Sequence, residues 1–395
     1  MRIAVTSYTA TSALGHGIRP LRQAIADNRS GLRRNDLDHC DLDTWIGRVE
    51  GLESVSLPAR LDHLDSRNNR LTLLGLQQDG FMSEVDSLID RCGVDRIGVI
   101  MATSTSSIGR TEEGYRHLGD DGLLPEQYRQ PWVHNLHSPG LTVAELTGLT
   151  GPSMTISTAC SSSAKIFASA ARWMKHGLVD AVLVGGVDSL CLSVMYGFNS
   201  LELLSASPCR PFDTGRDGIS LGEAACFALL ARENFAPEAK LELLGYGEST
   251  DAYHMSHPHP EGKGAILAMQ QALERAGLTA SDVDYINLHG TASKANDMVE
   301  THALDKVFPK KTLASSTKGW TGHALGTAGI LEAVITLDSM QCGLVPGTLN
   351  CREPDPLFSF PILTENMRTS ARIGMTNSFG FGGNNASLVF GRIND

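Results

Sequence analysis

Short apolar runs bounded by glycine or charged residues recur along this chain. They predict buried strands at residues 96–101, 153–157, 181–185, 225–230, 241–245, 285–288 and 386–390, and residues 1–7 are typical of a first strand. Helical patterns lie between several of these runs, at residues 162–176, 264–276 and 329–341. Strands that alternate with helices favour an α/β architecture.

The length of the chain predicts two core-forming units. Its 395 residues exceed the roughly 250–300 residues at which a single hydrophobic core stops growing. An internal echo supports a duplication, because residues 157–160 and 316–319 each precede a helix of small residues that ends in Gly-Leu-Val. We therefore expect two similar halves, 1–240 and 241–395, with Cys160 and the loop 318–323 in equivalent places.

Composition and charge narrow the class of protein. Apolar residues make up 42% of the chain and the formal charge is −11, which favours a globular protein without a nucleic-acid surface. The eight cysteines are scattered without a Cys-x-x-Cys pair and indicate reduced thiols. The N-terminus lacks the apolar core of a signal peptide, and no stretch reaches the ~18 apolar residues of a membrane span. We expect a cytoplasmic protein with no membrane span.

Cys160 is the strongest candidate for a nucleophile. It follows a predicted strand and begins a helix whose first residues are small. A thiol at a helix N-terminus lies at the positive end of the dipole, so we expect its pKa to be lowered. The free N–H groups there can also stabilise an oxyanion. The alternative is a buried structural cysteine, which remains the interpretation for the other seven.

Two histidines are the candidate partners of this thiol. His289 ends a predicted strand, and His323 lies in a glycine-rich turn five residues after Lys318. Such strand-to-loop junctions are where α/β enzymes place catalytic groups. Each histidine could also be a structural turn residue, and Lys318 an ordinary surface lysine. Together with Cys160, the two histidines predict a nucleophile-plus-base set.

Three further segments remain open. Residues 251–260 contain three histidines, but no carboxylate or cysteine completes a metal-ligand set there, so a loop that lines a pocket is favoured over a metal site. The glycine-rich residues 377–385 precede a strand rather than a helix, so we expect a mobile loop that carries Phe379 and not a phosphate cradle. Residues 102–107 have small side chains and either line a tunnel or form a plain strand-to-loop turn.

Taken in order, these segments resemble the elongating β-ketoacyl-acyl-carrier-protein synthases of the thiolase superfamily. The matching pieces span nearly the whole chain, at residues 157–162, 180–186, 210–218, 251–255, 289–291, 318–323 and 377–384. The resemblance implies a thiolase-like, five-layered αβαβα fold built from two similar halves. It also implies an acyltransferase that joins a cysteine-bound acyl group to malonyl carrier protein by decarboxylative Claisen condensation, in fatty-acid, polyketide or polyene chain elongation.

The resemblance also assigns a role to each site residue. Cys160 would carry the acyl group, His289 and His323 would bind the malonyl carbonyl, and Lys318 would support His323. Backbone amides of Cys160 and Phe379 would form the oxyanion hole, and the Phe379 ring would gate the acyl pocket. Thr291 and Ser293 would contact the pantetheine arm of an acyl carrier protein. No metal or separate cofactor is implied, because the substrates arrive on the carrier's phosphopantetheine.

The chain departs from the usual pattern of the family at several positions. It lacks the usual proline after His289, where Lys294 stands near the expected entrance, and Trp320 replaces a smaller residue. The loop 204–209 is also shorter than in the primary fatty-acid enzymes. These departures indicate a specialised pathway, such as that of an aryl polyene or another polyketide-like lipid.

Partners and alternative functions follow from the same resemblance. The family forms dimers, so we expect a homodimer or a heterodimer with a related ketosynthase subunit. The carrier protein is acidic, and Arg67, Arg70 and Lys294 are candidates for its basic docking site, although each could simply be a solvated surface charge. A non-catalytic chain-length factor is the alternative function, but it would be expected to lack Cys160. A thiolase would need a second cysteine near the C-terminus, and residues 377–385 contain none.

Overall fold

Ten strands form two five-stranded sections that meet in one continuous sheet. The computed structural model describes residues 1–393, in which the sheet runs β12-β11-β15-β16-β10-β1-β9-β7-β5-β6, with the short β2 paired to β1. The N-terminal section consists of β1 (Ile3–Ser12), β5 (Ile97–Ala102), β6 (Ser153–Ile156), β7 (Ala181–Asp188) and β9 (Ala224–Arg232). The C-terminal section consists of β10 (Leu241–Thr250), β11 (Tyr285–Asn287), β12 (Leu313–Ser315), β15 (Ile373–Gly380) and β16 (Asn384–Arg392).

The two sections repeat one pairing pattern. In the first, β5 pairs in parallel with β6 and β7, and the β7, β9 and β1 pairs are antiparallel. In the second, β11 pairs in parallel with β12 and β15, and the β15, β16 and β10 pairs are antiparallel. Thus β6 corresponds to β12, so Cys160 and Lys318 follow equivalent strands, as the internal echo predicted.

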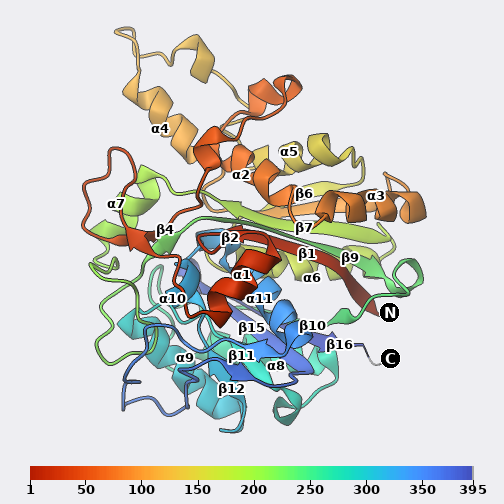
Figure 1. The fold of residues 1–395 in the computed structure, drawn as a ribbon, viewed down its shortest axis with the longest axis vertical. Helices are drawn as coiled ribbons and strands as arrows, with labels where there is room; N and C mark the ends of the chain where they lie inside the picture. Colours follow the sequence, from red (N-terminus) through yellow and green to blue (C-terminus); the bar gives the residue numbers. More distant parts are fainter. Residues whose placement is uncertain (394–395) are drawn as a thin grey trace.

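Helices cover both faces of the two sections (Figure 1). Between the sections lie α6 (Ser162–Lys175) and α11 (Ala328–Cys342), which contact each other. One outer layer contains α2 (Arg67–Leu76), α3 (Phe81–Cys92) and α5 (Ser138–Thr147), and the other contains α8 (Lys263–Ala276) and α9 (Lys294–Val307). This order of layers confirms the predicted αβαβα fold of two similar halves.

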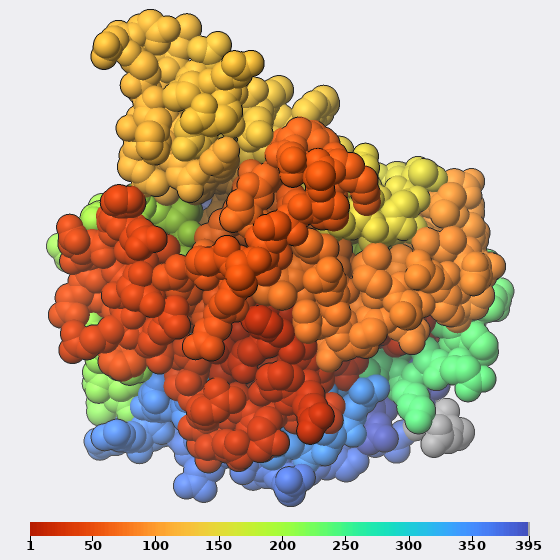
Figure 2. All heavy atoms as spheres, turned by 45° about the horizontal axis from the view of Figure 1, so that its top comes forward, coloured from red at the N-terminus to blue at the C-terminus, as the bar shows by residue number. Residues whose placement is uncertain are grey.

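The remaining elements are short or lie at the rims. The helices are α1 (Ile18–Ala26), α4 (Ile108–Arg116), α7 (Leu192–Ser200) and α10 (Lys318–Thr321). The strands are β2 (Gly15–His16), β3 (Arg33–Arg34), β4 (Trp45–Gly47), β8 (Leu221–Gly222), β13 (Leu344–Val345) and β14 (Met367–Arg368). The segment with α4 stands out from the body as a projection (Figures 1 and 2). Within residues 1–393 no helix combines the length and hydrophobicity that crossing a bilayer requires.

The central helix α11 is buried on every side. All its residues from Ala328 to Met340 are buried, which matches a sequence that is apolar all round rather than along one stripe. Its two buried carboxylates are both paired: Glu332 binds Lys318, and Asp338 binds Arg22 at 2.5 Å. A charge in this layer is tolerated because it has a partner.

One segment differs from its prediction. Residues 377–385 do not form a loop: β15 continues to Gly380 and β16 begins at Asn384, so Phe379 is a strand residue opposite Asn385. Only Phe381–Gly383 form a turn, in which Gly382 and Gly383 have φ values of 74° and 70°. These left-handed conformations need glycine, and the glycines of this tight hairpin hid the strand ends in the sequence.

Candidate active site

Cys160 lies at a sharp turn between β6 and α6. The preceding residue, Ala159, has a φ of 52°, a left-handed conformation that costs a non-glycine residue about 1–2 kcal/mol. The turn is held by the Ser162 hydroxyl, which accepts from the Thr158 N–H at 2.8 Å. The residues that follow are small, so the helix begins without bulky side chains around the sulfur. Cys160 is 7% exposed.

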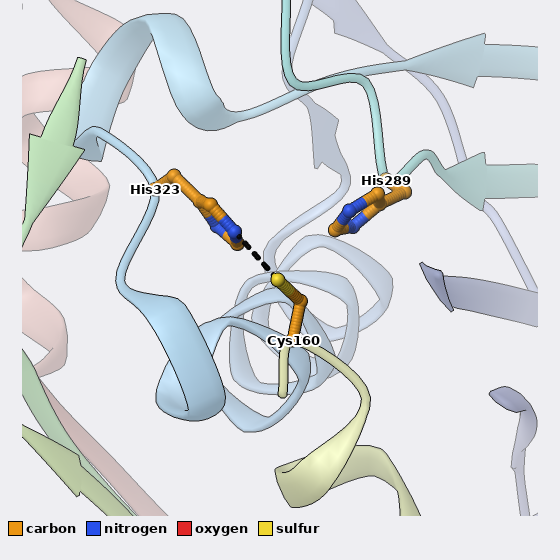
Figure 3. A group of neighbouring side chains, drawn as sticks. All are labelled: Cys160, His289 and His323. Carbon is orange, nitrogen blue, oxygen red and sulfur yellow. Dashed lines mark hydrogen bonds between the residues drawn. The ribbon is translucent and has the colours of Figure 1, made fainter. Parts of the chain in front are cut away.

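Cys160 meets the two predicted histidines. The Nε2 atom of His323 lies 3.0 Å from the Cys160 Sγ, and both imidazoles point toward the sulfur (Figure 3). The His289 and His323 ring centroids are 5.5 Å apart in an edge-to-face arrangement. All three residues are buried. Cys160 comes from the first half of the chain and both histidines come from the second, so the site forms where the halves meet.

Lys318 is buried in contact with His289. Its Nζ donates to the His289 carbonyl oxygen and to the carboxylate of Glu332, and it lies 3.4 Å from His289 Nδ1. The resemblance implied that Lys318 would support His323, but the hydrogen bonds of Lys318 reach His289. Its charge still acts on His323, because it helps to lower the pKa of that imidazole.

Burial dominates the protonation of this site. It raises the pKa of the Cys160 thiol to about 11, while Lys318 and the Phe381 backbone amide act in the lowering direction. The expectation that the helix N-terminus would leave this pKa lowered is therefore wrong, because desolvation of the thiolate outweighs the favourable charges. Burial, followed by Lys318, also places the pKa of His289 and His323 well below the usual value, so both imidazoles are neutral at pH 7.

The end of strand β15 and the turn after it bring backbone groups close to Cys160. The Phe381 backbone amide acts on the Cys160 sulfur, where it lowers the pKa of the thiol, and a Cβ on Gly380 would lie 3.0 Å from the Cys160 nitrogen. The geometry therefore does not support Phe379 as the second oxyanion amide and points to Phe381 instead. The Phe379 ring lies against His289, with centroids 6.1 Å apart, and the Phe381 ring stacks on Phe198 at 5.6 Å.

A cavity of about 420 Å³ leads from the surface to these groups. Thr291 and Ser293 line it, and their hydroxyl oxygens are 3.0 Å apart. His257 also lines it, which agrees with the expectation that residues 251–260 border a pocket. The residues that line the cavity do not include 102–107, of which Thr103, Ser104 and Thr105 bind Asp188 instead.

Comparison with protein families decides the assignment. Residues 1–236 match the N-terminal domain of β-ketoacyl synthases, and residues 241–352 match the C-terminal domain. The chain belongs to the β-ketoacyl synthase family. Among curated relatives, "3-oxoacyl-[acyl-carrier-protein] synthase 2" of Vibrio harveyi is 32% identical over 418 residues, covering 99% of each chain. "Nodulation protein E" of Rhizobium meliloti is 31% identical over 407 residues, again covering 99% of each chain.

Solved ketosynthases share the whole fold. A chain from the complex of the ketosynthase ApeO with its chain length factor ApeC, from Xenorhabdus doucetiae, is 37% identical with a TM-score of 0.90, over 99% of this chain and 98% of that one. A β-ketoacyl synthase from Burkholderia phymatum is 28% identical with a TM-score of 0.87, over 100% of both chains.

The three clustered side chains of this β-ketoacyl synthase also resemble a metal-ligand set. The ligand atoms of Cys160, His289 and His323 lie within 4.8 Å of one another. The Lys318 ammonium beside His289 disfavours a cation there, because like charges repel strongly in a buried site. At the surface, the Nδ1 atoms of His254 and His257 are 3.2 Å apart, and within the described residues no third ligand completes a set with them.

Sequence reasoning missed three buried carboxylates around the ketosynthase site. Glu300 accepts from the His289 and Gly290 N–H groups at 2.8 and 2.7 Å and so holds the His289 turn. Glu332 anchors Lys318, and Asp188 binds the loop that follows His323. Glu332 and Asp188 could have been found in the sequence, because each is a charged residue inside an apolar run. Glu300 could not, because its helix carries polar residues on several sides and the pattern does not mark Glu300 as buried.

Proposed function

We propose that this β-ketoacyl synthase performs decarboxylative Claisen condensation on carrier-bound thioesters. The observation that carries the proposal is the 3.0 Å contact of His323 Nε2 with Cys160 Sγ, beside the second neutral imidazole of His289. A nucleophile with two uncharged N–H donors matches a reaction that acylates sulfur and then stabilises an enolate.

The first half-reaction transfers an acyl group to Cys160. His323 Nε2 takes the thiol proton as the sulfur attacks the thioester carbonyl. The C–S bond to the carrier's arm breaks, and the proton passes to the departing pantetheine thiolate. The Cys160 and Phe381 amides hold the negative oxygen of the tetrahedral intermediate, which is the role that the sequence assigned to Phe379. A base is required because the pKa of the buried thiol is raised to about 11.

The second half-reaction consumes a malonyl thioester. Its bond to the carboxylate breaks to release carbon dioxide, and the electron pair forms an enolate whose oxygen accepts N–H bonds from His289 and His323. In this step the ring proton of neutral His323 is on Nε2, whereas in the first half-reaction it is on Nδ1 and leaves Nε2 free to act as the base. The enolate carbon attacks the acyl carbonyl on Cys160 and the C–S bond breaks, so a 3-oxoacyl thioester two carbons longer is formed. The Cys160 thiolate that leaves takes up one proton from solvent, relayed by His323, and the free thiol is restored. Lys318 keeps the imidazoles neutral, and neutral imidazoles remain able to exchange protons during the cycle.

The carrier's phosphopantetheine arm occupies the cavity in this proposal. Thr291 and Ser293 line the cavity between its mouth and His289, with hydroxyl groups suited to the amides of the arm. The proposed steps use only protein groups and the carried thioesters, so they call for no metal and no further cofactor. All eight cysteines are unpaired, which supports a reducing, cytoplasmic setting.

The acidic carrier protein docks beside Lys294 in this proposal. Arg67 is bound to Glu223 at 2.6 Å and to Glu53 at 2.7 Å, and Arg70 is bound to Asp65 at 2.5 Å. These carboxylates neutralise two of the three basic candidates. Lys294 is exposed, lines the cavity and forms no ion pair within residues 1–393, so its charge stays available to an incoming phosphate or carboxylate.

A dimer of like-folded subunits completes the proposal. The edge strand β6 ends the sheet, and the projection beside it exposes large apolar side chains, namely Tyr115, Leu118, Leu123, Trp132 and Leu136. An exposed apolar patch of this kind favours a protein interface. A similar chain belongs to the Xenorhabdus doucetiae complex of a ketosynthase with its chain length factor, which supports either a homodimer or a heterodimer of related subunits, in a specialised polyketide- or polyene-like pathway.

Product analysis tests the proposed function. The chain is incubated with acyl carrier protein and malonyl carrier protein, and the carrier-bound products are weighed by mass spectrometry. We expect a 3-oxoacyl carrier whose chain is two carbons longer than the primer, with one carbon dioxide released per product. Malonyl carrier that remains intact with every primer, even when a chain length factor is added, would contradict the proposal.

A further inference from the structure

Asp188 is a fully buried carboxylate at the end of β7, and only neutral groups bind it. Its Oδ1 accepts from Thr103 Oγ1 at 2.9 Å, from the Ser104 N–H at 2.8 Å, and from the N–H and the hydroxyl of Thr105, both at 2.7 Å. Its Oδ2 accepts from the N–H of Thr327 at 2.9 Å and from its hydroxyl at 3.1 Å. Burying a charge without a cation costs free energy, and the hydrogen bonds from the two loops that Asp188 joins offset that cost.

The two oxygens bind two different loops. Oδ1 holds residues 103–105, which leave β5, and Oδ2 holds η6 (Leu325–Thr327), which follows His323. The loops also touch each other, because a Cβ on Gly326 would lie 2.7 Å from Ser104 Oγ and 2.9 Å from Asp188 Oδ2. Leu325 has a φ of 53°, a strained conformation that the surrounding contacts must maintain.

The loop that leads into η6 also contains His323, whose backbone is held by hydrogen bonds. The His323 N–H donates to the Ser220 carbonyl at 2.8 Å, and its own carbonyl accepts from Gly222 at 3.0 Å. The N–H and the carbonyl of His323 are therefore both held by residues 220–222, and Asp188 holds the same loop four residues further on, at Thr327. Between these anchors its ring reaches Cys160 at 3.0 Å.

We propose that Asp188 is a positioning residue for the condensation: its carboxylate ties the loop of His323 to the loop that follows β5 and thereby sets the distance between His323 Nε2 and Cys160 Sγ. Asp188 touches no reacting atom, and it acts through His323. The inference rests on the proposed function wherever activity is the readout, so a structural readout accompanies it.

The isosteric change Asp188→Asn separates the two loops. The amide oxygen is expected to face the four donors of residues 103–105, which turns the NH₂ group toward the Thr327 N–H. The NH₂ group and the Thr327 N–H are then two opposed donors, so the loop of His323 loses its backbone bond and keeps at most the Thr327 hydroxyl, which can turn to accept. A displacement of about 1 Å near the chemistry can cost about 100-fold in rate.

Three measurements on Asp188→Asn, made below its unfolding temperature, test the proposal. We expect the kcat of acyl transfer to fall about 100-fold, with the KM for acyl carrier within about threefold of the wild type. Alkylation of Cys160 should be no slower than in the wild type, because a negative charge that raises the thiol's pKa has been removed. Loss of transfer with preserved thiol reactivity separates mispositioning of His323 from unfolding of the site.

Asp213→Asn is the matched control. Asp213 is also buried, and it accepts only from backbone N–H groups, those of Gly215, Arg352 and Glu353 at 2.7–3.0 Å, none of which lines the cavity. We expect this change to lower the unfolding temperature but to leave kcat and alkylation within about twofold. An equal loss of kcat in both variants, or an unchanged kcat in folded Asp188→Asn, would overturn the proposal.

Two further readouts keep the test decisive. If Asp188→Asn does not fold, Thr327→Val removes one of the two bonds on the His323 side, and an unchanged kcat in that variant would refute the role. If the wild type itself makes no product, the proposed function fails. The role of Asp188 in positioning His323 can then still be tested by a structure of the variant. A crystal structure of Asp188→Asn should then show His323 Nε2 moved by more than about 0.5 Å, and a smaller movement would overturn it.

Discussion

At the residue scale, the site combines a thiol whose pKa is raised with two neutral imidazoles. Burial raises the pKa of Cys160 to about 11 and lowers that of both histidines. A thiol with a raised pKa stays protonated, and therefore unreactive, until His323 takes its proton as the sulfur attacks a bound thioester. The same burial keeps the N–H groups of the imidazoles available to an enolate oxygen, because an uncharged ring does not need to be desolvated as an ion.

The reactivity of Cys160 should therefore rise steadily with pH. Alkylation requires the thiolate, so below a pKa of about 11 the rate at Cys160 should increase about tenfold per pH unit between pH 6.5 and 9.5. Peptide mapping by mass spectrometry follows Cys160 separately from the partly exposed Cys92 and Cys342. A rate that is already level below pH 8 would show that the thiolate is formed at rest.

The two histidines should be separable by their effects on the half-reactions. Of the two histidines, His323 is the one hydrogen-bonded to Cys160, so His323→Ala should slow both acylation and condensation. His289→Ala should leave acylation within a few-fold and slow condensation by about two to three orders of magnitude, since one enolate donor is lost. Single-turnover mass spectrometry measures the two steps separately. Equal effects of the two changes on acylation would contradict this division of roles.

At the element scale, the site depends on where strands and helices end. Most of these elements could be predicted from the sequence: the strand at Ala181–Asp188 and the helices Ser162–Lys175 and Ala328–Cys342 lie close to their predicted ranges. The residues that differ respond to long-range contacts. Phe381, rather than Phe379, faces Cys160 because of how the β15–β16 hairpin turns, and sequence periodicity carries no information about that turn.

The close approach of this hairpin predicts the effect of one methyl group. A Cβ at Gly380 would lie 3.0 Å from the Cys160 nitrogen and 3.1 Å from that of Ser161. Gly380→Ala should therefore displace the amides of the oxyanion hole and lower kcat by about 100-fold. Gly197→Ala is the control, because a Cβ there meets nothing within 4 Å and should stabilise α7 by about 0.5–1 kcal/mol. Steady-state kinetics and thermal unfolding of both variants check this, and an unchanged kcat in Gly380→Ala would count against it.

At the scale of the whole molecule, two similar halves supply different parts of one site. The first half contributes Cys160, and the second contributes both histidines, Lys318 and the hairpin. The family and the fold were evident from ordered motifs and from the echo between the halves. The carboxylates that support the site were not, because Asp188 acts on residues about 85 and 139 positions away in the chain. Such pairings depend on the assembled fold.

The projection around α4 predicts an oligomer. We expect the chain, expressed alone, to have about twice its monomer mass of 42.3 kDa by light scattering. Leu123→Asp places a charge in the exposed apolar patch and should shift the protein toward the monomer. Leu267→Asp, at a similarly exposed leucine of α8, should not. A wild type that is monomeric at micromolar concentration would contradict a homodimer.

The central claim is that acyl chains pass through Cys160 and are extended there. Intact-protein mass spectrometry tests it most directly, in a pulse with acyl carrier protein and a chase with malonyl carrier protein. We predict one acyl adduct on the wild type, none on Cys160→Ala, and loss of the adduct in the chase as a 3-oxoacyl carrier two carbons longer appears. An adduct that persists in Cys160→Ala, or that the malonyl carrier cannot discharge, would contradict the account.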